Sequence, residues 1–216
     1  MRPMLVIGLG HFGKNLALKL VEMGNEVMAV DKDEELVSKI VPFVTRAQIG
    51  DCMEIEVLRS LGVSNFDVCF VCISDNFQSS LEITSLLKEL GARYVVSKTD
   101  RDIQAKFLRI IGADDIIYPE RDMAQRTAIK YSIANAFEYY ELTPEYAILE
   151  ILVPENWVGK SIRTLNVRTN HNINIIGIKH NEQLTPMTDP DYPLIRGEHL
   201  IVAGSKHDLL SMVDKG

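Results

Sequence analysis

Short apolar runs alternate with helical patterns along the first part of the chain. Phe12, Leu16 and Leu20 recur at helical spacing after the first run, and similar patterns separate the later runs. The apolar runs have the length of β-strands and cover residues 4–8, 26–31, 46–49, 68–73, 94–98 and 115–118. Strands that are apolar on both faces and alternate with helices form parallel sheets covered on both sides. The pattern therefore predicts an α/β domain with a Rossmann-like, doubly wound parallel sheet over residues 1–118.

The pattern changes after residue 118. Pro119 can begin a helix, and Glu120–Tyr140 is predicted to be one long helix, so we assign residues 119–143 to a bridging helix. Further strands are expected at residues 146–153, 173–180 and 199–203, with helices at 161–165 and from Lys206 onward. These elements predict a second, smaller α+β C-terminal domain over residues 144–216.

A glycine-rich loop follows the first predicted strand and opens the first helix. Gly8, Gly10 and Gly13 form a G-x-G-x-x-G pattern, and Asp31 ends the second strand 18 residues beyond Gly13. Gly8 permits a tight turn, Gly10 lets a phosphate approach the backbone, and Gly13 lets the helix pack on the strand. The Asp31 carboxylate would accept hydrogen bonds from ribose hydroxyls and repel a 2′-phosphate, although Lys32 beside it weakens that discrimination. The pattern favours a nucleotide site; a glycine turn without a ligand is the alternative.

Other polar residues stand where predicted strands end. Asp51 and Ser74 follow the third and fourth strands, and Lys98 ends the fifth, all at the carboxyl ends where open α/β sheets bind ligands. Asp and Ser also favour turns and helix caps, and a lysine at such a place is often simply solvated. Glu120 stands in a first helical turn, where the helix dipole favours a carboxylate whatever its function. The residues alone leave both interpretations open.

Composition and charge narrow the function. Hydrophobic residues make up 46% and charged residues 25%, which is typical of a globular protein. The net charge of −7 argues against a nucleic-acid partner. The apolar runs are too short for a membrane span or a signal peptide, and the odd count of three cysteines fits a reducing compartment, so we expect a cytoplasmic protein. Cys69 and Cys72 lie within an apolar strand, which indicates buried, inert thiols. We find no motif of a nucleophile–base pair.

Several stretches together resemble one known family. These stretches are Val6–Gly13, Ala29–Asp31, Gly112–Asp114, Ile117–Met123 and Leu165–Arg168. They resemble the regulators of potassium conductance (RCK), the cytosolic gating subunits of bacterial Ktr and Trk potassium uptake systems. The resemblance covers the whole chain and is nearer to the Ktr type, because the duplicated Trk type would be about twice this length.

The resemblance implies a regulatory protein that is not an enzyme. In that family, dimers assemble into an octameric ring that docks under a membrane potassium-translocating subunit. ATP, ADP or NAD/NADH binds the N-terminal domains, changes the shape of the ring and so opens or closes the pore.

The resemblance also implies roles for individual residues. Asp31 would bind the adenosine ribose, Asp51 and Cys52 would lie beside the adenine, and Ser74 and Lys98 would line the remaining pocket. The loop of residues 8–13 would hold the phosphates.

Two further positions in that implied site concern the phosphates. Glu120 would reach a divalent cation, Mg²⁺ or Ca²⁺, near the phosphates across the dimer. His11, followed by Phe12, stands where Ktr-type members often carry an arginine that meets the terminal phosphate. A neutral histidine is a weaker phosphate partner than the bidentate arginine fork, which puts a preference for ATP over ADP or a dinucleotide in doubt.

Some family members bind cyclic di-AMP between paired C-terminal domains. Arg168, Asn174 and Pro190 loosely match the spacing of that site, although they also read as surface and turn residues. Two other functions stay open from the residues alone. One is a small NAD-dependent oxidoreductase that uses the same glycine loop, and the other is the detached gating domain of a ligand-gated potassium channel.

Overall fold

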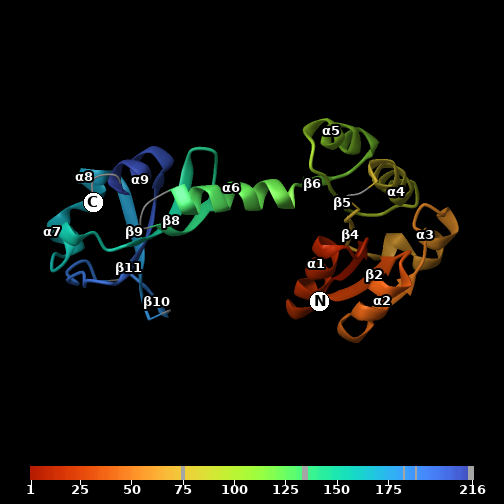
Figure 1. The fold of residues 1–216 in the computed structure, drawn as a ribbon, viewed down its shortest axis with the longest axis horizontal. Coiled ribbons are helices and arrows are strands. Elements are labelled where there is room, and N and C mark those ends of the chain that lie inside the picture. The colour runs from red at the N-terminus through yellow and green to blue at the C-terminus, as the bar shows by residue number, and fades with distance from the viewer. Residues whose placement is uncertain (74–75, 133–135, 182, 188, 214–216) are drawn as a thin grey trace. The chain divides into compact units, whose positions relative to one another are not determined.

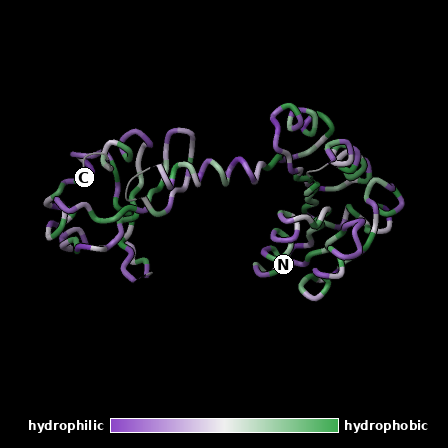
Figure 2. Tube along the Cα trace, in the orientation of Figure 1, coloured by the Kyte–Doolittle hydropathy of each residue, from purple (hydrophilic) through white to green (hydrophobic). Residues whose placement is uncertain are grey.

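The computed structural model describes residues 1–73, 76–132, 136–181, 183–187 and 189–213. The chain divides into two compact units, Met1–Arg121 and Asp122–Gly216, and each has its own hydrophobic core (Figure 1). In Figure 2 green, hydrophobic stretches run through both units and alternate with purple, hydrophilic ones.

The first unit is built on a six-stranded parallel sheet of order β3-β2-β1-β4-β5-β6. Its strands are β1 (Pro3–Ile7), β2 (Glu26–Asp31), β3 (Arg46–Ile49), β4 (Val68–Val71), β5 (Val95–Lys98) and β6 (Asp115–Ile117). Its helices are α1 (His11–Glu22), α2 (Glu34–Ile40), α3 (Ile55–Leu61), α4 (Phe77–Glu89) and α5 (Asp102–Ile111), with 3-10 turns at Val41–Phe43 and Val63–Asn65. This confirms the predicted doubly wound sheet.

The strand order reverses at β1, which pairs with β2 on one side and with β4 on the other. Helices α1 and α2 pack on one face of the sheet, with Val6 and Ala29, whereas α3 and α4 pack on the other face, with Leu5 and Val71. Doubly wound sheets bind ligands in the crevice at such a reversal, beyond the carboxyl ends of the strands.

Two cysteines, one in β4 and one directly after it, confirm the prediction of buried thiols. Cys69 and Cys72 are both buried and pack in the cores on opposite faces of the sheet. Burial raises the pKa of each thiol to about 12, so both stay protonated at neutral pH.

The second unit contains a five-stranded antiparallel sheet of order β10-β9-β11-β8-β7. Its strands are β7 (Ala136–Glu141), β8 (Tyr146–Leu152), β9 (Ile173–His180), β10 (Gln183–Pro186) and β11 (His199–Ser205). Helix α6 (Pro119–Ser132) leads into it, and α7 (Ile162–Leu165), α8 (Val167–His171), α9 (Lys206–Val213) and a 3-10 turn at Glu155–Trp157 complete it. The predicted α+β C-terminal domain is confirmed.

The prediction of one helix from Glu120 to Tyr140 is wrong over Ala136–Tyr140. Helix α6 is described over Pro119–Ser132, and Ala136–Glu141 form β7, which pairs antiparallel with β8. The reason lies in the aromatic residues of this stretch: Tyr139 is buried in the core of the second unit, and its neighbour Tyr140 is exposed. Aromatic side chains that alternate between core and solvent suit a half-buried strand better than a helix.

None of the helices in the described ranges combines the length and the apolar character that crossing a bilayer requires.

Candidate functional site

A cavity of about 640 Å³ opens at the carboxyl ends of the strands of the first unit. It lies where the strand order reverses, and its volume suits a small-molecule ligand. Of the residues predicted from the sequence, it brings together Gly8, Gly10, Asp31, Lys32, Asp51 and Cys52. Residues from three separate loops, after β1, β2 and β3, therefore meet at one place.

The three glycines of the loop are needed for different structural reasons. Gly8 has a φ of +91°, which disfavours a side chain, and a Cβ there would lie 3.2 Å from Cys72 and Ile73. A Cβ on Gly13 would lie 1.8 Å from the carbonyl oxygen of Gly8, so only glycine lets α1 pack this closely. A Cβ on Gly10 would meet nothing within 4 Å. Packing does not require glycine at position 10, and its missing side chain leaves the loop backbone open to the cavity.

The Asp31 carboxylate ties β2 to the glycine loop. Its Oδ2 accepts a hydrogen bond of 2.6 Å from the backbone N–H of Leu9, and its Oδ1 accepts one of 2.9 Å from the N–H of Asp33. A carboxylate offers about four acceptor positions, so about two are left for a ligand. The side chain is thus held rigidly at the cavity, with acceptor capacity to spare for hydroxyl donors.

Asp51 and Cys52 form the wall beyond β3. The backbone N–H of Gly50 donates to the carbonyl oxygen of Asp31 over 2.9 Å, and Asp51 Oδ1 accepts from the N–H of Met53 over 3.0 Å. Asp51 therefore has the turn role that its residue type favours, and it also lines the cavity. Burial, reinforced by the carboxylates of Asp51 and Asp31, raises the pKa of the Cys52 thiol to about 12. Cys52 is consequently a neutral, apolar part of the wall.

Lys98 and Glu120 form an ion pair next to α1. Lys98 Nζ lies 2.6 Å from Glu120 Oε1 and 5.6 Å from the centre of the Phe12 ring. The lysine side chain is only 6% exposed, whereas that of Glu120 is 65% exposed. The hydrogen bond from Lys98 holds the pKa of Glu120 below its ordinary value. The resemblance assigns Lys98 to the nucleotide pocket and Glu120 to a cation across the dimer; in this chain the two side chains form an ion pair with each other.

The remaining predicted residues lie outside the cavity lining or outside the described ranges. His11, Phe12 and Gly13 form the first turn of α1, and the side chain of His11 points to solvent. Ser74 lies outside the described residues. Among the residues that are described, no group of three His, Cys, Asp or Glu side chains is placed to hold a metal ion.

Nothing in the sequence indicated that certain other residues would line the cavity. Leu36, Met53, Ser79 and Ile83 line the cavity, and Ser79 Oγ donates to Met53 Sδ over 3.1 Å. Leu36 and Ile83 belong to the apolar patterns of α2 and α4, so nothing distinguishes them from core residues. Asn76 also lines the cavity, and its side chain caps α4 by accepting a hydrogen bond from Ser79 N over 3.2 Å.

In the second unit, two of the three predicted residues come together. Arg168 Nε donates to Asn174 Oδ1 over 2.7 Å, and both side chains are exposed. Pro190 lies in the segment after β10, where its carbonyl oxygen accepts from Arg163 N over 3.0 Å.

Comparison with known proteins gives a consistent result. Two family profiles match the chain, the TrkA-N domain over residues 4–119 and the TrkA-C domain over residues 148–215. The chain is 38% identical over 204 residues to Ktr system potassium uptake protein C of Bacillus subtilis (strain 168), covering 94% of this chain and 92% of that protein. It is 37% identical over 211 residues to Ktr system potassium uptake protein A of the same organism, covering 98% and 95%.

Solved structures share the fold. A structure described as the GsuK channel bound to NAD matches with a TM-score of 0.69 and 18% identity over 99% of this chain. The present chain spans 39% of the length of that channel chain. A structure of GsuK bound to ADP matches 60% of this chain with a TM-score of 0.53 and 15% identity.

Proposed function

The chain belongs to the family of TrkA-N and TrkA-C domain proteins that includes the Ktr potassium uptake proteins, and on that premise we propose that it is a nucleotide-binding regulatory subunit that gates a membrane potassium transporter or channel. In this role the chain binds a regulatory ligand and does not need to contact the transported ion. Gating requires only that the nucleotide binds two conformations of the assembly with different affinity. No catalytic step is needed, and we propose that the chain is not an enzyme.

The observation that carries this proposal is the Asp31 carboxylate held against the glycine loop at the edge of the large cavity. A nucleotide would place its ribose hydroxyls on the spare acceptor positions of Asp31 and its phosphates over Gly10, at the start of α1. The base would lie against the neutral wall at Asp51 and Cys52. GsuK, a structural neighbour, has been solved with NAD and with ADP, and both ligands contain an adenosine diphosphate.

Selectivity among nucleotides would depend on the residues that contact the terminal phosphate. The Lys98–Glu120 pair lies beside Phe12, and His11 follows Gly10 in the loop. A bound phosphate would attract Lys98 and compete with Glu120 for it. Glu120, once released, could supply one carboxylate to a divalent cation whose other ligands come from the phosphates and a second subunit.

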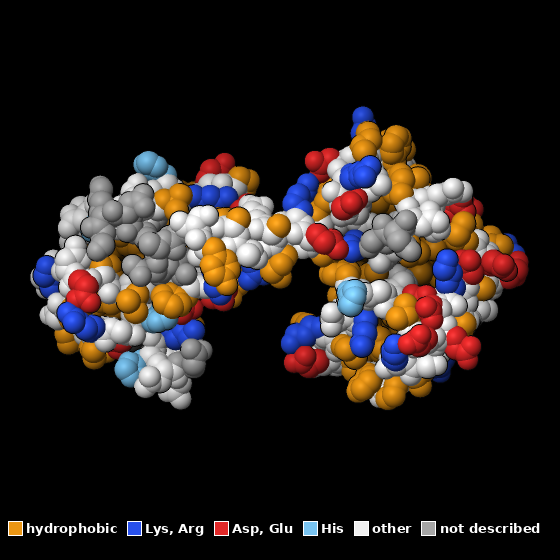
Figure 3. Space-filling model, viewed as in Figure 1, with side chains coloured by type: hydrophobic (Ala, Val, Ile, Leu, Met, Phe, Trp, Pro, Cys, Tyr) orange, Lys and Arg blue, Asp and Glu red, His pale blue; other side chains and the backbone are white. Residues whose placement is uncertain are grey.

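An exposed apolar stripe supports assembly of several copies into a ring. Ile103, Phe107 and Ile110 of α5 are 56%, 47% and 70% exposed and lie on one face of the helix. Figure 3 shows hydrophobic side chains gathered over this part of the first unit. Large exposed apolar patches mark protein interfaces. We propose a homo-oligomer, as an octameric ring of dimers, that docks on the cytoplasmic side of its membrane partner.

The Arg168–Asn174 pair supports a second regulatory site in the C-terminal domain. Its guanidinium and amide groups are exposed and already joined, so they present donors on one surface. We propose that this surface binds cyclic di-AMP between paired C-terminal domains, with Pro190 contributing from the neighbouring segment.

Thermal melting of the full chain against ATP, ADP, NAD⁺, NADH and NADP⁺, with and without Mg²⁺, tests the nucleotide site. A ligand at 100 times its dissociation constant stabilises the folded state by about 2.7 kcal/mol, which raises the melting temperature by several degrees. We expect ATP, ADP or NAD⁺ to stabilise the protein, and NADP⁺ to do so less than NAD⁺ because its 2′-phosphate approaches Asp31.

Equal stabilisation by NAD⁺ and NADP⁺ would contradict the assigned role of Asp31. Failure of every nucleotide to shift the melting temperature would remove the site altogether. Potassium flux in vesicles that hold the membrane partner then tests gating: the stabilising nucleotide should change the flux only when this chain is present.

A further inference from the structure

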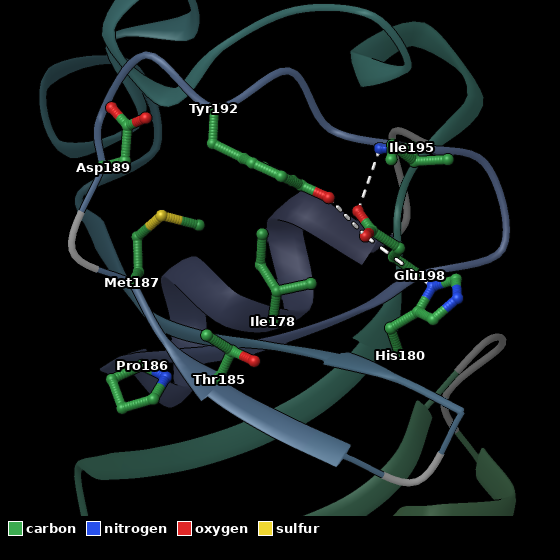
Figure 4. Close-up of a pocket in the computed structure, with 9 residues that line it drawn as sticks. All are labelled: Ile178, His180, Thr185, Pro186, Met187, Asp189, Tyr192, Ile195 and Glu198. Carbon is green, nitrogen blue, oxygen red and sulfur yellow. Dashed lines mark hydrogen bonds and ion pairs between the residues drawn. The ribbon is translucent and has the colours of Figure 1, made fainter.

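A second cavity lies in the C-terminal unit, apart from the glycine loop. It has a volume of about 350 Å³ and is lined by residues of β9, β10 and the segment that leads to β11 (Figure 4). The motifs read from the sequence did not point to it, and nothing in the proposed nucleotide site depends on it. Its volume is at the lower end of the range for small-molecule sites.

A buried carboxylate forms one end of this cavity. The side chain of Glu198 is only 3% exposed. Its Oε1 accepts a hydrogen bond of 2.6 Å from Tyr192 OH, and its Oε2 accepts one of 3.0 Å from the backbone N–H of Ile195. Figure 4 shows the carboxylate between these two donors. They fix its position, and about two of its four acceptor positions remain for another donor.

Most of the groups that surround this carboxylate are neutral. Tyr192 stays a neutral donor, because its hydrogen bond to Glu198 raises the pKa of the phenol. Among the described residues, the basic side chain that faces the carboxylate is His180, whose Nδ1 lies 3.8 Å from Glu198 Oε1. The imidazole is 61% exposed and carries a charge only when protonated. Burying an ionised carboxylate with so little positive charge beside it costs free energy, and a ligand with a positive charge would lower that cost.

The rest of the wall is mostly apolar. Ile178 and Met187 flank the cavity, the ring of Tyr192 covers it, and Thr185 adds one hydroxyl (Figure 4). Asp189 also belongs to the lining, but Figure 4 shows it pointing away from Glu198, and its Oδ1 accepts from the backbone N–H of Asp191 over 2.9 Å. An aliphatic side, an aromatic ring and one carboxylate together recognise an amine with a short carbon chain. An aromatic face and a carboxylate both attract an ammonium group.

We propose that this cavity binds a small organic cation, a primary ammonium on a short aliphatic chain. The ammonium donates to the free acceptor positions of Glu198, and the chain packs against Ile178 and Met187. An inorganic cation fits less well, because it would need several oxygen ligands, and the wall offers few besides the carboxylate. An anion is repelled by Glu198.

Saturation-transfer NMR with n-butylammonium tests the proposal on the full chain. The probe should receive saturation from the protein, and its signal should not be displaced by ATP, ADP or NAD⁺. The neutral analogue 1-butanol and the anionic analogue butyrate carry the same carbon chain without the positive charge. We expect both to bind at least tenfold more weakly, since a hydrogen bond to a charged group contributes about that much.

Two variants assign the binding to this cavity. Glu198→Gln should weaken n-butylammonium binding by more than about tenfold. The matched control is Glu155→Gln, which neutralises a carboxylate that is 64% exposed and paired with Arg196 in the same unit. That control should bind the probe as wild type does.

A second substitution covers the case in which Glu198→Gln fails to fold. Met187→Trp fills the cavity and leaves both hydrogen bonds of Glu198 in place, so it should abolish binding. Wild-type affinity in Met187→Trp or in Glu198→Gln overturns the proposal. Equal binding of 1-butanol, or no saturation transfer to n-butylammonium in the wild-type protein, overturns it as well. These results are independent of the nucleotide experiment, because either site can be present without the other.

Discussion

In the first unit, the carboxylates at the cavity are hydrogen-bonded to backbone N–H groups, whereas in the second unit the buried carboxylate of Glu150 faces ionisable side chains. Asp31 accepts from Leu9 N and Asp33 N, and Asp51 accepts from Met53 N. Glu150, a buried residue of β8, accepts instead from His199 Nδ1 over 2.7 Å and from Lys179 Nζ over 3.2 Å.

The difference teaches how each unit positions its site. In the first unit, loop geometry places the side chains, so the close approach of backbones is what must be preserved. In the second unit, buried charges hold neighbouring strands together, so charge balance is what must be preserved. The predictions below test this contrast, from the largest expected effect to the smallest.

Gly13→Ala should have the largest effect on the first unit. A Cβ there would lie 1.8 Å from Gly8 O, which neither backbone can accommodate without moving α1 away from β1. We expect a loss of about 3 kcal/mol in the free energy of unfolding, measured by denaturant titration with circular dichroism. Gly10→Ala is the matched control, because its Cβ would meet nothing within 4 Å, and it should change stability by less than about 1 kcal/mol. Equal losses in both variants would show that backbone contact is not what position 13 requires.

Glu150→Gln should have a nearly equal effect on the second unit. The substitution leaves His199 and Lys179 without the buried carboxylate that they share, and breaking a buried pair costs about 3 kcal/mol. The fluorescence of Trp157, the single tryptophan of the chain and part of the second core, reports on this unit during denaturation. Glu155→Gln, at an exposed pair with Arg196, should change the midpoint little. An unchanged midpoint in Glu150→Gln would mean that this unit does not depend on its buried charge.

Asp31→Ala should weaken nucleotide binding by about tenfold, since a hydrogen bond to a charged group contributes about 1.5 kcal/mol or more. Titration calorimetry with the nucleotide that stabilises the wild-type protein measures the change. The control is Asp33→Ala, which removes the cap of α2 from the edge of the same cavity and should lower stability more than affinity. Unchanged affinity in Asp31→Ala would place the ribose elsewhere.

Asp114→Asn should lower the stability of the first unit by about 1 kcal/mol near neutral pH. Burial alone raises the pKa of Asp114, but hydrogen bonds from Val95 N (2.7 Å) and Lys88 Nζ (3.0 Å) outweigh it and hold the pKa below its ordinary value.

A carboxyl whose pKa is lowered by folding stabilises the protein above its unfolded pKa and loses that contribution as the pH falls through its folded pKa. The wild-type advantage over Asp114→Asn should therefore be complete at neutral pH and disappear in acid. The control is Glu22→Gln, at the exposed pair with Lys19, which should change the free energy of unfolding little. An advantage that persists in acid would assign the effect to packing.

Glu120→Gln should have the smallest effect. Its side chain is 65% exposed, so the loss of the ion pair with Lys98 should change stability by less than about 1 kcal/mol. The informative measurement is the melting temperature with nucleotide, with and without Mg²⁺. If Glu120 supplies a metal ligand, the Mg²⁺-dependent part of the shift should shrink in the variant. Identical Mg²⁺ dependence in variant and wild type would show that Glu120 does not bind the metal and acts through the ion pair with Lys98.

The sequence predicted the first unit well because its signals are local. Each strand is a short apolar run, and Gly8, Gly13 and Asp31 stand at the positions that the glycine-rich pattern and the end of the second strand define. It failed at β7 because the sequence after Ser132 contains no Gly or Pro before Tyr140. Only pairing with β8 and the burial of Tyr139 make Ala136–Glu141 a strand.

By itself, the sequence determined the doubly wound sheet, the glycine loop, the acidic end of β2 and the buried cysteines, since these follow from periodicity and from the steric freedom of glycine. The tertiary structure decided which polar side chains meet. It joined Lys98 to Glu120, Arg168 to Asn174, and Glu198 to Tyr192 and the apolar wall of the second cavity. A side chain's partner across strands depends on the register of the sheet and on the path of the loops, and no short stretch of sequence encodes either.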